Sequence, residues 1–277
     1  MSTTGRLFRG ARQVEALGLD DRGFRYGEGL FETMRGHRGT IPWWPAHWQR
    51  LASGAARLGL PLPPAGRVLE ETTRLLAGRD AVLRLQLTRG GGGRGYAPPT
   101  APEPSWALTL HPLPAPPAAE GLRLRWCELR LGAQPALAGL KHCNRLEQVL
   151  ARAELETGEP ADEGLLRGPD DELVSAIAAN VFVLLGGQWL TPPVERCGVA
   201  GVCRGWLLGQ GLARVQALSR GEVERADAVV LGNAVRGILP VSRLGGRRWP
   251  PHPRTAALRA ALAAAHPAFA DTDQETA

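Results

Sequence analysis

The sequence predicts an α+β protein of two domains, and three observations support this fold class. A length of 277 residues fits two modest domains or one large one, and the 44% hydrophobic content supplies a sizeable core. The segment 112–119 (PLPAPPAA) is too rich in proline for a helix or a central strand, so we interpret it as a connection between domains. Segments with strand and helix periodicity lie on both sides of it. We expect a small N-terminal α/β domain at 1–113, a linker at 114–120 and a larger domain at 121–277.

The N-terminal part combines the two-residue period of strands with the spacing of helices. Residues 81–88 (AVLRLQLT) alternate apolar and polar side chains, as a strand does. Residues 45–58 place Leu51, Ala55 and Leu58 on one face of a helix. The further elements expected here are short strands within 6–20, a strand from 27–34, a turn at 36–39, a helix at 65–78, a glycine-rich loop at 89–95 and a strand at 106–110.

Beyond the linker, the same periods predict more strands and three helices. The expected strands are at 122–129, 163–166, 180–185, 189–190 and 228–231, and the expected helices are at 146–157, 201–213 and 254–266.

Composition limits the classes of function. No apolar run is long enough to span a bilayer, and the N-terminus lacks the apolar core of a signal peptide, so we expect a cytoplasmic protein without a membrane partner. The net charge of +6 fits an anionic small substrate, and because the arginines are scattered we expect no nucleic acid. The four cysteines lack metal-site spacing, so reduced thiols and no metal site are expected; they are Cys127, Cys143, Cys197 and Cys203.

Lys141 is the only lysine of a chain whose lysines and arginines total 33. An arginine stays protonated and cannot form a stable Schiff base, whereas a lysine amine can attack a carbonyl. Lys141 is therefore a candidate for a covalent catalytic role. The alternative is a lysine that survives by chance on a solvated surface, and the neighbouring motifs have to decide between the two.

Four segments, taken in their order and spacing, resemble the fold-type IV pyridoxal phosphate enzymes. This group holds the branched-chain and D-amino-acid aminotransferases of class IV and the aminodeoxychorismate lyases. The resemblance covers about residues 20–245 and implies a barrel-like C-terminal domain with helices, pyridoxal 5'-phosphate in the cleft between the domains, and a homodimer. The four segments are 21–32 (DRGFRYGEGLFE), 47–51 (HWQRL), 140–148 (LKHCNRLEQ) and 178–182 (AANVF).

The resemblance also implies roles for single residues. Lys141 would hold the cofactor covalently and later move protons. Arg50 would bind the phosphate, although a solvated arginine on an amphipathic helix is the alternative. The backbone N–H groups of Val202 and Cys203, at the start of a helix, would point towards the same phosphate. Asn180 and Asn233 complete the expected cofactor contacts, although Gly201 and Asn233 are also typical turn residues.

One position departs from the family pattern. Family members usually carry a glutamate five residues before the asparagine of the xxNxF segment, and this chain has Ser175 there. A serine hydroxyl can hydrogen-bond the pyridine nitrogen of the cofactor but supplies no counter-charge. Glu172 is nearby but out of register. We expect a weaker electron sink, which counts against full transamination.

The glycine-rich loop points to a substrate. Residues 89–96 (RGGGGRGY) resemble the corresponding loop of the aminodeoxychorismate lyases, whose substrate carries two carboxylates. Arginines on such a loop suit a dianion, while the alternative is a basic, mobile surface loop. The substrate-binding candidates are Tyr26, Arg35, Arg89, Arg94 and Ala234.

The function that this resemblance implies is that of a 4-amino-4-deoxychorismate lyase, which releases pyruvate and 4-aminobenzoate for folate synthesis. The first alternative is a class IV aminotransferase acting on D-amino or branched-chain acids. The second is a non-catalytic binding protein on the same scaffold that touches nucleic acid, against which the presence of Lys141 and Arg50 counts.

Overall fold

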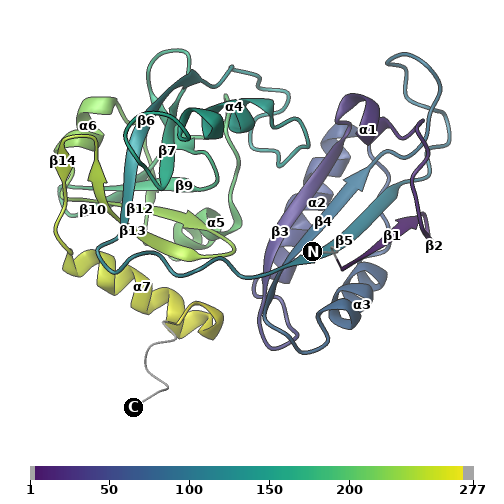
Figure 1. The fold of residues 1–277 in the computed structure, drawn as a ribbon, viewed down its shortest axis with the longest axis horizontal. Helices are drawn as coiled ribbons and strands as arrows, with labels where there is room; N and C mark the ends of the chain where they lie inside the picture. The colour runs from purple at the N-terminus through teal and green to yellow at the C-terminus, as the bar shows by residue number, and fades with distance from the viewer. Residues whose placement is uncertain (1–3, 271–277) are drawn as a thin grey trace. The chain divides into compact units, whose positions relative to one another are not determined.

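The computed structural model describes residues 4–270, which divide into two compact units. The first unit comprises the chain up to Pro114 together with the short segment Leu140–Asn144. The second comprises Ala115–Gly139 and the chain from Arg145 onwards (Figure 1). The segment around Lys141 thus belongs to the first unit, although the sequence on both sides of it belongs to the second.

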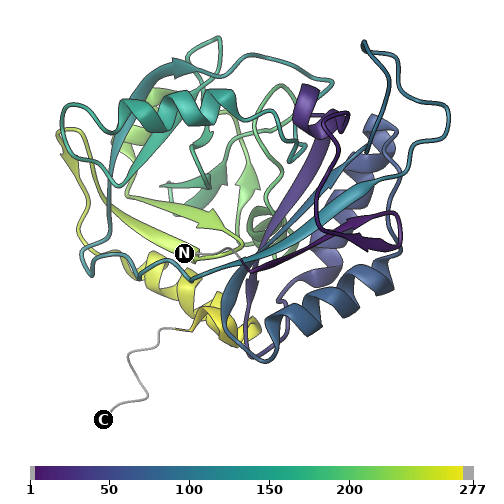
Figure 2. The ribbon, with the colours of Figure 1, turned by 45° about the vertical axis from the view of Figure 1, so that its right-hand side comes forward.

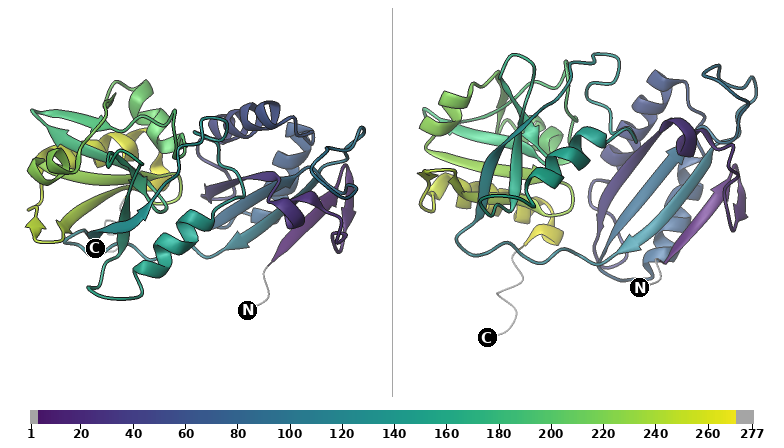
Figure 3. Two further views of the ribbon diagram at one scale, coloured as in Figure 1. Left: turned by 90° about the horizontal axis from the view of Figure 1, so that it is seen from above. Right: turned by 45° about the horizontal axis from the view of Figure 1, so that its top comes forward.

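The first unit is an antiparallel sheet with two long helices on one face (Figure 3). The order of its five strands is β2 (Arg12–Val14), β1 (Gly5–Arg9), β5 (Ser105–His111), β4 (Ala81–Thr88) and β3 (Gly29–Gly36). The long helices are α2 (Trp44–Leu58) and α3 (Ala65–Leu76), and a short helix, α1 (Arg22–Tyr26), precedes β3.

Side-chain alternation explains why the helices cover only one face of this sheet. Leu83, Leu85 and Leu87 of β4 are at most 1% exposed, whereas Arg84 and Gln86 between them are half-buried. The three leucines share their face with the buried apolar side chains of α2 and α3 and form the core of the unit. The opposite face carries Arg84 and Gln86 together with the apolar side chains of Phe31 and Val82.

The second unit is a curved sheet of nine strands wrapped around a large apolar core (Figure 2). Parallel pairs join β10 to β11, β13 to β6 and β6 to β7, and the remaining pairs are antiparallel. The strand order is β11 (Arg214–Val215), β10 (Gln188–Thr191), β9 (Asn180–Leu185), β12 (Ala228–Asn233), β13 (Gly237–Leu244), β6 (Leu122–Arg130), β7 (Glu163–Arg167) and β8 (Leu173–Ala176), with β14 (Arg247–Arg248) paired to β13.

Short helices border this sheet. Helix α4 packs on β6 and β7, α5 on β12, and α7 on β13. No helix within residues 4–270 is long and apolar enough to cross a membrane. The helices are α4 (Leu146–Glu154), α5 (Val202–Gly209), α6 (Arg220–Arg225), α7 (Pro253–Ala265) and the single 3-10 turn η1 (Pro267–Phe269).

The structure adds elements that the sequence analysis did not predict. Strand β13 contains Pro240, which disguises it because proline is rare inside strands. Helices α1 and α6 are too short for a periodic pattern and depend on caps, with Asp21 accepting from Gly23 N and Ser219 forming a capping box with Glu222. The expected helix at 201–213 is wrong in its length, because α5 ends at Gly209.

Candidate active site

Lys141 is fixed by backbone pairing with the outer edge of β3. Lys141 C=O accepts a hydrogen bond from Phe31 N at 2.9 Å, and Cys143 N donates to Gly29 C=O at 2.9 Å. The Nζ of Lys141 lies 4.3 Å from the centre of the Phe31 ring. Two main-chain bonds thus hold the residue whose amine would carry the chemistry, and its side chain lies against an aromatic face.

The face of β3 that carries Phe31 is cationic. Phe31 and Arg35 point to the same side of the strand, because side chains alternate with a period of two. Arg84 pairs with Thr33 across the sheet, and its guanidinium carbon lies 4.2 Å from the centre of the Phe31 ring. Burial lowers the pKa of Arg35, although the charge of Asp80 opposes the shift. Because burial penalises the charged guanidinium, an anion bound beside it would offset that penalty. Lys141 and two arginines therefore share a sheet face suited to an anion.

Arg84 was not among the residues expected at the site. The sequence does indicate on which face of its strand Arg84 lies. In the alternating segment AVLRLQLT, a charged residue takes a position on the face away from the core. Alternation does not show which face of the sheet would carry the chemistry. That face is identified by the contact of Phe31 with Lys141, which lies more than one hundred positions further along the chain.

The helix-covered face of β3 holds a buried charge cluster. Glu32 accepts a hydrogen bond from His47 Nδ1 at 2.6 Å and one from Arg50 Nε at 2.8 Å, and a terminal nitrogen of Arg50 forms a second contact with the same carboxylate. Glu32 and His47 are each 1% exposed and Arg50 is 14% exposed. Arg50 is therefore not a solvated surface arginine but is held in a two-point ion pair.

The pKa shifts of the cluster define its protonation. Burial opposes ionisation of Glu32, but the charge of Arg50 and the hydrogen bonds from His47 and Arg50 outweigh it and lower its pKa. Burial lowers the pKa of His47, and the opposing effect of Glu32 does not restore it. A carboxylate can only accept, so a neutral His47 donates from Nδ1. This histidine acts as a support for Glu32 and Arg50.

In the second unit, the start of α5 has the form of an anion site. Its N-cap is Gly201, which offers no side-chain hydrogen bond, and the first turn contains no acidic residue. A Cβ at Gly201 would lie 2.0 Å from Asn180 Oδ1, so glycine is required there. The N–H groups of Val202 and Cys203 lie in the first turn, where N–H groups have no acceptor within the helix. They also lie at the positive end of the helix dipole. These features fit a phosphate.

The other expected cofactor contacts have mixed surroundings. Asn233 Oδ1 accepts from Val235 N at 3.0 Å and from Arg236 N at 2.8 Å, which is a turn-forming role around Ala234. Ser175 is 9% exposed on β8. Glu172 does not replace the missing carboxylate, because it accepts from Asp170 N at 2.9 Å and lies 3.6 Å from Arg196.

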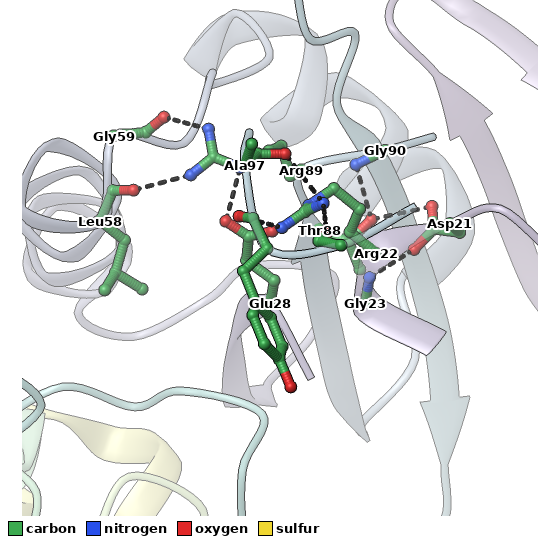
Figure 4. Close-up of polar contacts among 12 residues, drawn as sticks. Asp21, Arg22, Gly23, Glu28, Leu58, Gly59, Thr88, Arg89, Gly90 and Ala97 are labelled. Carbon is green, nitrogen blue, oxygen red and sulfur yellow. Dashed lines mark hydrogen bonds and ion pairs between the residues drawn. The ribbon is translucent and has the colours of Figure 1, made fainter. Parts of the chain in front are cut away.

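The two loop arginines differ in their surroundings, and Figure 4 shows those of Arg89. Arg89 is 6% exposed, and its guanidinium donates to Glu28 at 2.6 Å, Gly59 C=O at 2.7 Å and Leu58 C=O at 2.9 Å. All three nitrogens thus serve the fold, which argues against the expected substrate role of Arg89. Arg94 is exposed at the tip of the same loop. Of the two, Arg94 is the arginine presented to solvent.

Solved structures resemble this fold over almost its whole length. A 4-amino-4-deoxychorismate lyase from Pseudomonas aeruginosa superposes with a TM-score of 0.85 at 39% identity, covering 93% of this chain and 98% of that chain. A branched-chain amino acid aminotransferase of T.th., solved with pyridoxamine 5'-phosphate, gives a TM-score of 0.80 at 21% identity, covering 96% of each chain. The second likeness concerns the fold alone. The protein has the two-domain architecture of the fold-type IV enzymes.

Sequence comparison gives the family. The model of the amino-transferase class IV family matches residues 29–244. An aminodeoxychorismate lyase of Vibrio harveyi is 35% identical over 233 residues, which cover 81% of this chain and 86% of the relative. The chain therefore belongs to the amino-transferase class IV family and is an enzyme.

Proposed function

We propose that this protein converts 4-amino-4-deoxychorismate to pyruvate and 4-aminobenzoate, a precursor of folate, with pyridoxal 5'-phosphate in the cytoplasm. One observation carries the proposal: Lys141 is fixed against Phe31 on a sheet face that also carries Arg35 and Arg84. That face carries an amine and two guanidinium groups. The substrate carries two carboxylates and an amine that can react with the cofactor aldehyde. The names of the relatives from Vibrio harveyi and Pseudomonas aeruginosa support the same substrate.

The residues present suit pyridoxal phosphate. In the first unit, Lys141 would supply the amine that holds the cofactor aldehyde. In the second unit, the start of α5 at Val202 and Cys203 would supply N–H donors for a phosphate. Arg50, whose orientation Glu32 fixes through Nε and one terminal nitrogen, would add its positive charge. Asn180, Asn233 and Ser175 are the further cofactor contacts. The cofactor, when bound, withdraws electrons from the substrate carbon next to the amine and acidifies its proton.

Lys141 would perform the proton transfers. With cofactor and substrate bound, the Lys141 amine would remove the proton from ring carbon C4 of the substrate. The C–O bond at the neighbouring ring carbon then breaks, and the side chain leaves as the enol of pyruvate while the ring becomes aromatic. The leaving oxygen takes a proton from Lys141 or from another group.

Ser175 suits a lyase better than an aminotransferase. A hydroxyl supplies no charge to stabilise a protonated pyridine nitrogen, so the electron sink is weaker than with a carboxylate. Aromatisation of the ring drives the elimination and makes the weaker sink sufficient. Transamination has no comparable driving force.

Arg35, Arg84 and Arg94 are the candidates for the two substrate carboxylates. Arg35 and Arg84 lie on the face of Lys141, and Arg94 lies at the tip of the glycine-rich loop with Tyr96. The ring of Tyr26 lies 5.5 Å from that of Tyr96 and gives the loop an aromatic neighbour.

The test is release of 4-aminobenzoate from enzymatically generated aminodeoxychorismate, with Lys141→Ala as the inactive control. Release that disappears in the variant supports the lyase and the role of Lys141 together. A folded, cofactor-loaded protein that releases nothing overturns the lyase. If the same protein forms pyridoxamine phosphate from an amino acid alone, it is an aminotransferase.

The quaternary structure we propose is a homodimer, as the family resemblance implies. Helix α4 exposes three apolar side chains, which are 75%, 59% and 58% accessible and belong to Leu146, Val149 and Leu150. Contiguous apolar side chains on a soluble protein favour burial against a partner, and a second copy would cover them. Light scattering tests this: a dimeric wild type and a monomeric Leu150→Glu variant are expected, whereas a monomeric wild type contradicts the proposal.

A further inference from the structure

We propose that Arg22 is a positioning residue that holds the glycine-rich loop at residues 90–97 and thereby places Arg94 and Tyr96. The statement about the loop depends only on contacts within the first unit. The consequence for substrate binding rests on the proposed function.

The side chain of Arg22 is directed at the loop backbone (Figure 4). It is 3% exposed, and it donates from Nη1 to Gly95 C=O at 3.0 Å and to Ala97 C=O at 3.3 Å. Its Nη2 donates to Tyr96 C=O at 3.0 Å. One guanidinium thus binds three consecutive carbonyl groups. An arginine used in this way is occupied by the main chain and is not itself a substrate ligand.

Glu28 fixes the other side of the same guanidinium. Its carboxylate contacts Nε of Arg22 and also accepts from Nε of Arg89 at 2.6 Å. Burial opposes ionisation of Glu28, but the hydrogen bonds and charges of the two arginines lower its pKa. Because Arg89 is bound to the last carbonyl groups of α2, Glu28 links Arg22 to a rigid helix end.

The backbone of Arg22 holds the start of the loop as well. Arg22 N donates to Gly90 C=O at 2.9 Å, and the preceding Asp21 accepts from Thr88 Oγ1 at 3.0 Å. Asp21 also caps α1 by accepting from Gly23 N at 2.8 Å. The two ends of the loop are therefore tied to one residue, the first end by its N–H group and the second by its side chain.

The composition of the loop explains why it needs such an anchor. Residues 90–93 are all glycine and have no side chains to pack, so an ordered loop loses much conformational entropy. Arg94 is exposed, and Tyr96 is 86% exposed although its ring lies 5.5 Å from that of Tyr26, so these two side chains bury little of the loop against the unit. The three carbonyl bonds of Arg22 supply order that the loop sequence does not.

Limited trypsin digestion of the holoenzyme tests the anchor without any activity measurement. Arg94 is the only basic residue between Gly90 and Thr100, so cleavage there gives a fragment whose mass identifies the site. Arg22→Met is expected to speed this cleavage about tenfold, because the cleaved segment must open from its bound state first. The matched control is Arg79→Met, since Arg79 also donates to two backbone carbonyls, those of Leu75 and Leu76 at the end of α3. It is expected to leave cleavage after Arg94 unchanged.

A second pair of variants reaches the same contact from the loop side. A Cβ at Gly92 would lie 2.9 Å from Cδ of Arg22, whereas a Cβ at Gly93 would meet nothing within 4 Å. Gly92→Ala should therefore displace Arg22 and speed cleavage after Arg94. Gly93→Ala, which stiffens the loop equally, should not. Equal cleavage rates in Arg22→Met, Gly92→Ala and the parent would overturn the proposal.

Kinetics separates positioning from a general structural role. Arg22→Met is expected to raise KM for aminodeoxychorismate about tenfold with kcat within about twofold, since the loop contributes binding rather than proton transfer. Arg22→Lys, which can restore a single carbonyl bond, should recover part of both the KM and the resistance to trypsin. Faster cleavage with unchanged KM would retain Arg22 as the loop anchor and overturn the substrate role of the loop.

Discussion

Glu32 Oε2 and His47 Nδ1 lie 2.6 Å apart inside the first unit, with both side chains almost fully buried. The pKa of Glu32 is lowered against the effect of burial, mainly by the charge of Arg50, and the pKa of His47 is lowered by burial. The pair is therefore a carboxylate and a neutral imidazole at neutral pH. The orientation of Arg50 depends on this pair, so the protonation of the pair should affect stability and the proposed binding of the cofactor phosphate.

Acidification should destabilise the protein in two stages. The unfolded state takes up a proton on His47 below its ordinary pKa of 6.5, while the folded state with its lowered pKa resists this, so stability falls as the pH drops through that value. A single such group contributes a slope of at most about 1.4 kcal/mol per pH unit. Glu32 adds a further loss below its ordinary value of 4.5, where its carboxylate is protonated in the unfolded state first.

Denaturant unfolding between pH 7.5 and pH 5 measures the first stage. His47→Gln keeps an N–H donor for Glu32 but cannot be protonated, so part of the pH slope should disappear. His111→Gln changes an exposed histidine and should keep the slope of the parent. A slope that is identical in His47→Gln and the parent contradicts the assignment of a neutral, buried His47.

Removing the charge of Glu32 should weaken both the fold and the phosphate site. Glu32→Gln removes the carboxylate charge that pairs with the largely buried guanidinium of Arg50, and breaking a buried ion pair typically costs about 3 kcal/mol. The affinity for pyridoxal phosphate should fall as Arg50 loses its orientation. Glu70→Gln is the control, because Glu70 is 52% exposed and its ion pairs with Arg67 and Arg74 contribute less than about 1 kcal/mol. Unchanged cofactor affinity in Glu32→Gln would separate this cluster from the phosphate.

Gly201→Ala should reduce cofactor affinity about tenfold, because a Cβ 2.0 Å from Asn180 Oδ1 forces the start of α5 to move. Gly205→Ala lies in the same helix with nothing within 4 Å of its Cβ, and it should raise stability by about 0.5–1 kcal/mol with unchanged affinity. Cofactor titration followed by absorbance measures both. Equal affinity in both variants means that the start of α5 does not contact the phosphate.

Ser175→Glu should give the enzyme more aminotransferase activity. The carboxylate would hold the pyridine nitrogen of the cofactor protonated, so pyridoxamine phosphate should form faster from an amino acid alone than in the parent. Because Ser175 is 9% exposed, the same variant should be less stable without the cofactor. Lower basicity of the ring nitrogen in Ser175→Glu than in the parent would contradict the explanation based on a weakened electron sink.

The sequence predicted those parts of the fold and site that depend on local pattern. The strand at 81–88 and the helix at 45–58 each have a period that repeats within the segment. The two-domain α+β class follows from such local periods on both sides of the proline-rich connection. Lys141 stood out because no other lysine is present. The structure places it by main-chain pairing with β3, and its chemical role stays a prediction.

What the sequence could not predict depends on contacts between distant residues. Nothing in the order of residues shows that Arg89 directs its guanidinium to Glu28 and the end of α2, because those contacts span up to 61 positions. The same holds for Arg84, whose neighbour Phe31 lies on another strand. Arg22 was missed because charged residues in short turns usually face solvent, and its burial follows from the position of the loop.

The pairing of Lys141 with β3 also covers part of one edge of the five-stranded sheet. Strand β3 is the last strand of its sheet, and the segment that carries Lys141 covers its outer side at Gly29 and Phe31. A chain that ended after Pro114 would keep all five strands but expose this edge to any extended polypeptide. Such a fragment would aggregate edge to edge, and a peptide spanning 139–145 would suppress the aggregation by occupying the open strand position.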